Sequence, residues 1–340
     1  YVVERWLRND RVEMRANPYY FLGPPKITQL IVRFIPSPPS ATNQLQTHEI
    51  TGYFNEQDYS QYPLLQALRG YAVLNTPVSA VDALIFNTRG PLTNDARVRH
   101  GLAEAIDVHS LVAKSYRGAL ESHDAARGLF LWAYDPRALP DVPYDPDDAR
   151  RLLESAGWAL GPDGVRHKGA RALDLLLIIQ AAVPGEAIAA NVIAQYERAV
   201  GARVTLKQFA VTQFGAPAAL GGPVYGGKFD MALYSFVNGD DPDTTDQFAC
   251  ANVPPNGYNK SRICDPQIDR LLAAGRATYD VAARKAIYAR LQALLYAQLP
   301  LVLLYQRREL DVFPALLRGP DGSIDSVFWD VARWRFERGA

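Results

Sequence analysis

The sequence predicts an α/β protein with two lobes, and three observations lead to this fold class. Strand-like apolar runs alternate with helical patterns from residue 84 to residue 305, which is typical of α/β folds. Residues 1–83 are richer in strand patterns and prolines, so they indicate a different lobe. The strand-like run Phe229–Tyr234 opens into an acidic Gly/Pro loop that ends at Asp243. Such strand ends are where α/β folds commonly place a ligand.

The first lobe begins with strand patterns. Residues 11–15 alternate in polarity, residues 17–25 form a turn-rich connector, and residues 27–35 are again strand-like. A helix over residues 62–68 and a strand over residues 71–74 follow. A separate apolar strand over residues 81–87 stops at the polar Asn87.

Helical signals dominate the next part of the chain. Asn94 or Asp95 can cap a helix whose apolar positions continue from Val98 as far as Val112. Asp145 precedes a proline at the first position of another helix, which Gly157 ends. The remaining predicted elements are a strand (172–179), a helix (186–200), a strand (203–209), the strand already named, two helices (266–275 and 281–298) and a last apolar strand (300–305).

Composition excludes two classes of partner. Of the 340 residues, 48% are apolar and 21% are charged, as in globular proteins, and the length allows one large domain or two lobes. Lys and Arg number 36, as do Asp and Glu, so the formal net charge is zero. This balance argues against a chain-wide nucleic-acid-binding surface and against strong attraction to anionic membranes. The longest apolar run, residues 173–183, is shorter than the ~20 residues that span a bilayer.

The start of the sequence carries no signal-peptide pattern. Tyr1 already lies in a strand-like run without a basic leader. We expect either a mature protein or a chain cut inside a domain. An unprotected strand at the first residue favours the second.

Two cysteines follow the acidic loop. Cys250 comes seven residues after Asp243, and Cys264 lies fourteen residues further on. The count alone favours neither a disulfide nor two free core thiols. The prolines at 254 and 255, followed by Asn256 and Gly257, place the intervening segment on the surface, which favours a disulfide in an oxidising compartment. Closing such a loop stabilises by roughly 3 kcal/mol in the chain-entropy model.

Catalytic motifs find little support. Asp145–Asp148 forms a helix cap and no carboxylate dyad, residues 221–227 lack the Lys-Ser/Thr ending of a phosphate loop, and no Gly-x-Ser-x-Gly elbow occurs. His100 and His109 are predicted to face opposite sides of one helix. No metal-ligand spacing is formed by the five histidines, which are His48, His100, His109, His123 and His167. We expect no enzyme, no cofactor and no metal.

Five segments in order resemble one family. They are Trp6 to Asn17-Pro18-Tyr19-Tyr20, Asp95–Asp107, Tyr144–Trp158, Lys228–Asp243 and Cys250–Cys264. The chain is similar in these segments to family 5 extracellular solute-binding proteins, the oligopeptide-, dipeptide- and nickel-binding proteins of bacterial ABC importers. The resemblance extends over nearly the whole chain, and it implies that the cysteines crosslink their loop.

The resemblance implies a two-lobed α/β fold of the type II periplasmic-binding-protein kind that lacks the N-terminal part of lobe I. Residues 1–84 and 307–340 would be partial lobe I and residues 85–306 lobe II, with the hinge near residues 84–87 and 304–307. It further implies a monomer outside the cytoplasm, periplasmic or extracellular, with a lipid anchor in a Gram-positive host. Ligand would bridge the lobes, favour their closure, and pass to a membrane permease.

Peptides are the ligand class that the resemblance implies first, with one departure. Peptide-binding members hold an Asp four residues before the proline, where it neutralises the α-ammonium of the peptide, and this chain holds Asn238 there. Asp240 and Asp241 stand closer to Pro242. Either the ligand has no free amino terminus, or Asp240 supplies the charge, since a neutral amide gives an ammonium no charge-assisted hydrogen bond. Sugars, opines and metal chelates stay open. Alternatively, these side chains form Asx turns with their own backbone.

Aromatic residues complete the candidate ligand wall. Tyr234, Ser235 and Phe236 end the strand, and alternation sends only some of them to a cleft. By resemblance, Tyr305 is a ligand-facing tyrosine. Trp132 lies with Tyr134 in a Pro-rich loop and either lines the cleft or is structural.

Two other classes of function remain as rivals. A hydrolase in the same cleft would need a nucleophile and a base facing Tyr305 or Asn238. A ligand-sensing regulatory module would carry a basic DNA-binding segment upstream, whereas a signal peptide there would indicate an importer protein.

Overall fold

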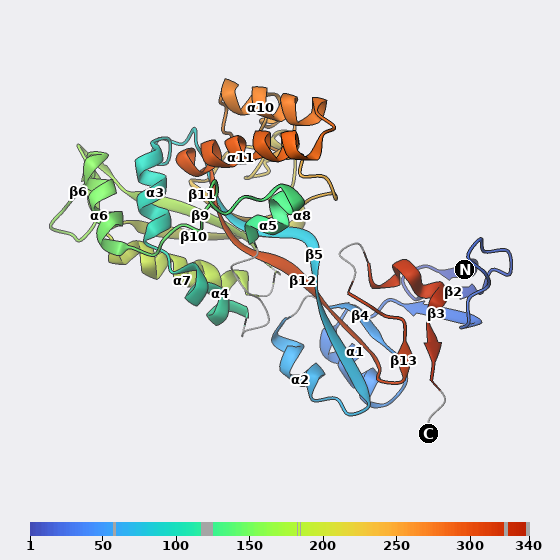
Figure 1. The fold of residues 1–340 in the computed structure, drawn as a ribbon. Coiled ribbons are helices and arrows are strands. Elements are labelled where there is room, and N and C mark those ends of the chain that lie inside the picture. Colours follow the sequence, from blue (N-terminus) through green and yellow to red (C-terminus); the bar gives the residue numbers. More distant parts are fainter. Residues whose placement is uncertain (57–58, 117–124, 182, 184, 323–325, 338–340) are drawn as a thin grey trace. The chain divides into compact units, whose positions relative to one another are not determined.

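The computed structural model describes residues 1–56, 59–116, 125–181, 183, 185–322 and 326–337. The chain divides into two compact units, unit 1 (Tyr1–Val78 with Arg308–Ala340) and unit 2 (Ser79–Arg307). That these units are the two lobes stays a prediction. Two long strands, β5 (Tyr71–Phe86) and β12 (Leu301–Pro314), run through both units (Figure 1).

Unit 1 is built from short strands, and its small core is aromatic. Its elements are β1 (Val2–Leu7), β2 (Arg11–Arg15), β3 (Gln29–Arg33), α1 (Pro38–Gln46), β4 (Tyr53–Glu56), η1 (Tyr59–Gln61), α2 (Tyr62–Gln66), β13 (Leu317–Arg318), η5 (Val327–Arg333) and β14 (Arg335–Phe336). Strands β1, β2 and β3 form an antiparallel sheet. Phe313, Leu317 and Trp334 are buried together, with Phe54 and Phe328 packed against them.

Unit 2 contains most of the helices. They are α3 (Ala96–Glu104), α4 (Val108–Tyr116), α5 (Ala125–Phe130), η2 (Leu131–Ala133), α6 (Pro146–Ser155), α7 (Glu186–Ala199), α8 (Val211–Phe214), η3 (Ala218–Leu220), α9 (Thr245–Phe248), η4 (Cys250–Asn252), α10 (Pro266–Ala277) and α11 (Val281–Gln298). The strands are β6 (Ala159–Leu160), β7 (Arg166–Lys168), β8 (Arg171–Ala172), β9 (Asp174–Gln180), β10 (Arg203–Phe209) and β11 (Met231–Val237).

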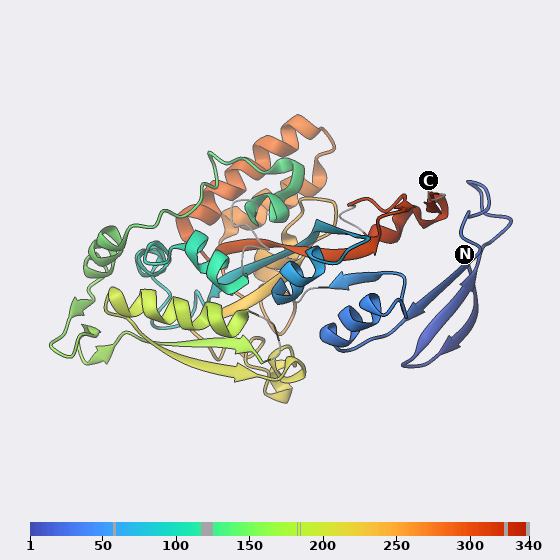
Figure 2. The ribbon, with the colours of Figure 1, turned by 90° about the horizontal axis from the view of Figure 1, so that it is seen from below.

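The main sheet has the strand order β10-β9-β11-β5-β12-β4. Strands β10 and β11 pair with β9 in parallel, and β11 pairs with β5 antiparallel, from Met231 opposite Phe86 to Val237 opposite Ala80. Helix α7 runs along β9 and β10 (Figure 2). The core of unit 2 includes Ile85, Ile178 and Leu291, none of which exposes surface.

Local signals set several element ends as predicted. Asp145 accepts hydrogen bonds from the N–H groups of Asp147 and Asp148, and so caps α6. Gly157 follows that helix at φ 90°, a conformation that glycine adopts without strain. Asp95 caps α3 by accepting from Arg97 N–H.

Several predicted elements were wrong in extent, among them the last apolar strand (300–305), which continues as β12 to Pro314. The helix expected to continue to Val112 breaks into α3 and α4, because Asp107 accepts from Ser110 N–H and Oγ and starts a new helix. The strands predicted over 71–74 and 81–87 are one strand, β5. The apolar pattern is interrupted at Pro77, but this residue lies outside the stretch paired with β11, so its missing N–H costs no bond on that side.

Arg99, in the Asp95–Asp107 segment, connects α3 to the end of α11. Its guanidinium is buried and donates from Nε to the carbonyls of Gln298 (2.9 Å) and Leu299 (3.1 Å) at the end of α11. It also donates from Nη1 to the carbonyls of Thr93 and Asn94. The last carbonyls of a helix lack partners within the helix. Arg99 donates hydrogen bonds to two of these carbonyls at the end of α11.

Candidate functional site

The end of β11 presents three of the predicted residues in different environments. Tyr234 is half-buried, and its ring stacks on Phe214 at a centroid distance of 6.4 Å. Ser235 is half-buried, and its Oγ has no hydrogen-bond partner among the described residues. Phe236 is only 6% exposed and belongs to the core of unit 2. Burial raises the pKa of Tyr234 to about 12, so its hydroxyl remains a neutral donor.

Asn238 uses both ends of its side-chain amide within the protein. Its Nδ2 donates to the carbonyl of Gly128 at 3.3 Å, and its Oδ1 accepts from Nε2 of Gln247 at 3.2 Å. Its backbone N–H donates to the carbonyl of Ser79 at 2.7 Å. The amide therefore helps to fix the start of the acidic loop, and it uses one of its two N–H donors and part of the acceptor capacity of its oxygen.

The two aspartates of the acidic loop differ. Asp241 is bound by both terminal nitrogens of Arg284, at 2.8 and 2.7 Å, which holds the pKa of this carboxyl below its ordinary value. Its Oδ1 also accepts from Asp243 N–H, which is the Asx turn weighed from the sequence. Asp240 is exposed. Arg284 neutralises Asp241, whereas no arginine among the described residues neutralises Asp240.

Arg284 also joins Trp132 to this loop. Its guanidinium carbon lies 5.3 Å from the Trp132 ring centroid and 5.5 Å from that of Tyr288. The Trp132 side chain remains 38% exposed. A tryptophan backed by a fixed cation is a rigid surface on which an apolar or planar ligand group can stack.

Lys260 was missed by the sequence analysis. It is fully buried, and its ammonium lies 3.5 Å from the ring centroid of Tyr225, 4.3 Å from Tyr258 and 6.0 Å from Tyr234. Burial lowers its pKa to about 7. Tyrosine faces stabilise a cation by their quadrupole. The lysine therefore links the 221–227 loop, the cysteine loop and the candidate wall through one group.

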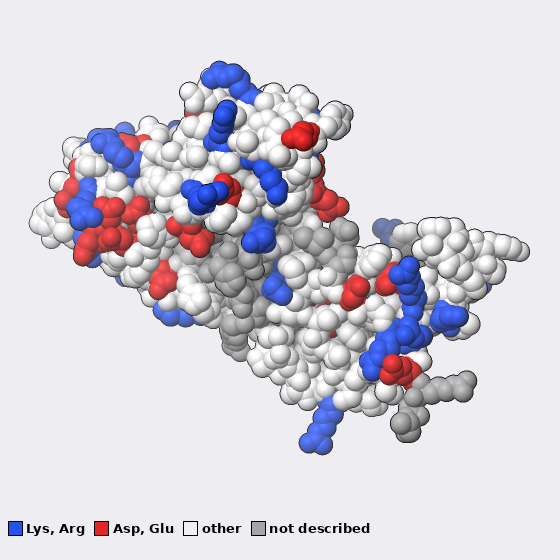
Figure 3. Space-filling view, in the orientation of Figure 1, with Lys and Arg blue, Asp and Glu red and all other residues white. Residues whose placement is uncertain are grey.

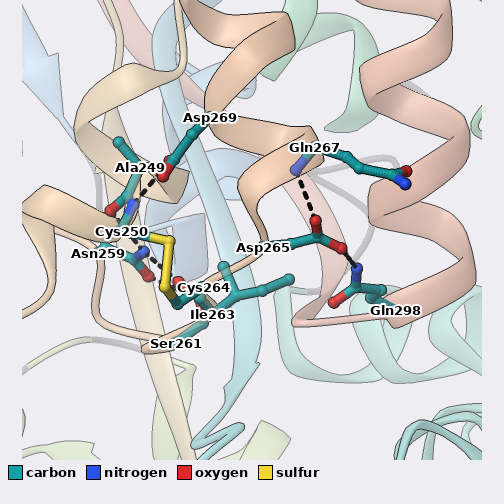
Figure 4. The surroundings of a disulfide bond; sticks show 10 residues. All are labelled: Ala249, Cys250, Asn259, Ser261, Ile263, Cys264, Asp265, Gln267, Asp269 and Gln298. Carbon is teal, nitrogen blue, oxygen red and sulfur yellow. Dashed lines mark hydrogen bonds between the residues drawn. A yellow bond between two sulfur atoms is a disulfide. The ribbon is translucent and has the colours of Figure 1, made fainter.

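A disulfide between Cys250 and Cys264 closes the loop that follows (Figure 4). Inside it, Nδ2 of the buried Asn259 donates to the carbonyls of Ala249 (3.0 Å) and Ile263 (2.8 Å). Cys250 N–H donates to Asp269 of α10 at 2.9 Å. The disulfide prediction is confirmed, and the loop is anchored by hydrogen bonds as well.

Tyr305 lies away from these exposed groups. It is 2% exposed, and its hydroxyl donates to the Tyr116 hydroxyl at 2.8 Å. Next to it, Arg307 pairs with the buried Asp82 at 2.5 Å. The structure thus gives Tyr305 a hydrogen-bonded place in the interior of unit 2.

The histidines are separated as well. His100 lies on α3 and His109 on α4, so the expectation of a shared helix was wrong. His123 lies outside the described residues. Among the residues that the structure does describe, no group of three or more His, Cys, Asp or Glu side chains is placed to hold a metal ion. Within that same part of the chain, no helix is both long and apolar enough to cross a membrane.

Comparison with protein families decides the class. The family model for bacterial extracellular solute-binding proteins, family 5 (middle part), matches residues 1–258. The chain belongs to this family.

Curated relatives in the family are named for peptides. The chain is 28% identical to the probable di/tripeptide-binding protein 5 of Pseudomonas aeruginosa and 29% identical to its di/tripeptide-binding protein 2. Each match includes 88% of this chain and 54% of the relative. The chain therefore spans about half the length of the curated relatives it matches.

Solved structures confirm the fold class. The crystal structure of NikA from Brucella suis in complex with Fe(III)-EDTA superposes with a TM-score of 0.84 at 19% identity. The match includes 98% of this chain and 67% of NikA. This family 5 chain therefore has the mixed α/β fold of type II periplasmic binding proteins.

Proposed function

We propose that this chain is the larger part of an extracytoplasmic solute-binding protein that delivers a peptide to an ABC transporter permease. The match of residues 1–258 to the family, together with the di/tripeptide-binding names of its relatives, carries this proposal. The Cys250–Cys264 disulfide supports a place outside the cytoplasm, because disulfides persist in oxidising compartments. The protein would act as a monomer, and it would bind its ligand without chemical conversion, as the naming of the family indicates.

The proposed ligand wall on unit 2 would consist of residues that contact the ligand and residues that hold the first group in place. Tyr234, Asp240 and Trp132 offer exposed or half-buried groups to a ligand, whereas the Oγ of Ser235 is buried. Asn238, Asp241 and Phe236 would hold this wall in shape through the contacts described above, whereas Tyr305 would be an interior residue of unit 2. A wall of mixed aromatic and polar groups suits peptides of varied sequence, because main-chain groups and water can supply most of the hydrogen bonds.

We propose that Asp240 binds the free amino terminus of the peptide. Asp241 is already neutralised by Arg284, Asp243 accepts hydrogen bonds from N–H and Oγ1 of Thr245, and Asn238 is neutral. Asp240 is therefore the exposed carboxylate of this loop that we assign to an ammonium. A charge-assisted bond to a well-placed carboxylate is about twice as strong as a neutral one.

The neutral Asn238 amide, which is hydrogen-bonded within the protein, favours a second candidate, a ligand without an amino terminus. A sugar, an opine or a metal chelate would need no carboxylate at this wall. The same fold holds Fe(III)-EDTA in NikA.

Thermal shift and calorimetry with trialanine, N-acetyl-trialanine and Ni(L-His) separate these candidates. The peptide proposal expects saturable binding of trialanine, weakened by Tyr234→Ala and by Asp240→Asn. Tyr279→Ala serves as the control, since Tyr279 is 96% exposed on the α10–α11 connection. Acetylation should weaken binding to wild type and leave Asp240→Asn unaffected. Equal binding of both peptides by wild type removes the role of Asp240, and binding of the chelate alone replaces the peptide by the second candidate.

A further inference from the structure

A concave site lies within unit 2. It is a pocket of about 220 Å³ between α5, the segment 139–144 and the junction of α11 with β12. We refer to it as the α5–α11 pocket. Its lining includes none of the residues predicted as ligand contacts.

The interior of the α5–α11 pocket is apolar and fixed by the core. Leu129, Phe130 and Phe248 line it, and each is at most 2% exposed. Leu295 and Leu299, at the end of α11, line another side. A cavity of about 150 Å³ lined by such side chains binds benzene. This pocket can therefore take one aromatic ring or a short alkyl chain without rearrangement of the core.

The rim of the pocket carries acidic groups. Asp107 and the exposed Asp141 line it, together with Tyr144, Tyr296 and the exposed His109. Acidic side chains gather over this end of unit 2, with arginines among them (Figure 3). The polar edge is therefore rich in acceptors for a donor group, while the interior offers none.

Glu104 is a further acidic residue near the rim. Its side chain is 9% exposed, and its Oε2 has no hydrogen-bond partner among the described residues. Burial, followed by the charges of Asp148 and Asp145, raises its pKa to about 7. The charge of Glu104 adds to burial in raising the pKa of Tyr296, a rim residue. The nearby Arg151 is already paired with Asp148 at 2.8 Å.

We propose that the α5–α11 pocket binds a small amphipathic amine, with its apolar group in the pocket and its ammonium at the Asp107–Asp141 rim. The shape selects a single ring or a short chain, and the charge of the rim selects a cation. An apolar pocket with a few polar groups at its edge is the usual form of a small-molecule site. The site is separate from the proposed peptide wall.

Three compounds of one shape test this proposal on the 340-residue chain. They are 2-phenylethylamine, 2-phenylethanol and 3-phenylpropionate, titrated by calorimetry and by ligand-observed NMR. We expect saturable binding in the order amine, alcohol, carboxylate. Equal binding of the amine and the carboxylate, or no saturable binding of the amine at millimolar concentration, overturns the proposal.

Two variants assign the binding to the pocket. Val142 is half-buried, so Val142→Trp fills the pocket from the 139–144 segment and should abolish binding of the amine. Asp141→Asn changes an exposed side chain and should weaken the amine about two- to fivefold, as expected for an exposed ion pair, while leaving the alcohol unchanged. Asp10→Asn, an exposed acid of unit 1, is the matched control. Unchanged amine binding in Asp141→Asn refutes the role of the rim, whether or not Val142→Trp folds.

Discussion

The Cys250–Cys264 crosslink provides the sharpest prediction of stability. The two cysteines are 14 residues apart in sequence. In the chain-entropy model, a loop of this length restricts the unfolded chain by an amount worth about 3 kcal/mol. The double substitution Cys250→Ala with Cys264→Ala should therefore lower the free energy of unfolding of unit 2 by about this amount.

The native loop should survive this substitution. Asn259 binds two backbone carbonyls from inside the loop, and Cys250 N–H is held by Asp269 through a backbone bond that alanine preserves. The effect of the crosslink then lies in the unfolded state. We therefore expect an unchanged near-ultraviolet circular dichroism spectrum at low denaturant.

Urea unfolding followed by circular dichroism measures the change. Wild type in reductant should match the double alanine variant, and reductant should leave the variant unchanged. The matched comparison is Asn259→Ala, which removes two buried bonds and leaves carbonyls unpaired, at a cost of about 1–3 kcal/mol for each unsatisfied group. If the alanine pair costs less than about 1 kcal/mol while Asn259→Ala costs more, hydrogen bonds hold the loop and the entropic argument fails.

Three further predictions concern single side chains of unit 2. Because the folded pKa of Glu104 is raised to about 7 from 4.5, stability should fall as pH rises through this window, and Glu104→Gln should remove that fall. Urea unfolding at several pH values measures this effect, and the same pH dependence in wild type and in Glu104→Gln would contradict the argument. Lys260 has no exposed surface, so mass spectrometry after brief acetylation should find it unmodified while the exposed Lys228 reacts. Equal labelling would contradict the buried position of Lys260. Arg284→Met should free Asp241 and speed amide hydrogen exchange in residues 239–243, whereas unchanged exchange would show that the loop needs no ion pair.

Local chemistry made much of the fold predictable. The strand at 203–209 and the helix at 281–298 have the predicted bounds, because each has a nearby end signal, Gly201 before the strand and the capping Asp280 before the helix. The disulfide was predictable from its surface-forming neighbours. The extent of β5 was not, because pairing with β11 and β12 decides where a strand continues, and Asn75–Pro77 breaks its apolar pattern.

The site was less predictable than the fold. The sequence located the end of β11 and its acidic loop, but the partners of that loop come from distant elements. Arg284 is on α11 and Trp132 is in η2, and neither position carries a local signal for contact with Asp241. Lys260 meets Tyr225 only because two loops pack together. Contacts that depend on tertiary packing leave no periodicity in the sequence.

The two strands shared by the units also bear on protein engineering. β5 and β12 are neighbours in the sheet, and Phe86 N–H donates to the carbonyl of Pro300, so the end of one strand lies beside the start of the other. Residues 79 and 307 therefore terminate unit 2 on adjacent strands. Unit 2 can be excised as one continuous segment whose ends a short turn could join, which would give a circularly closed domain. Unit 1, in contrast, is drawn from both ends of the chain and needs a linker in place of 229 residues (79 to 307).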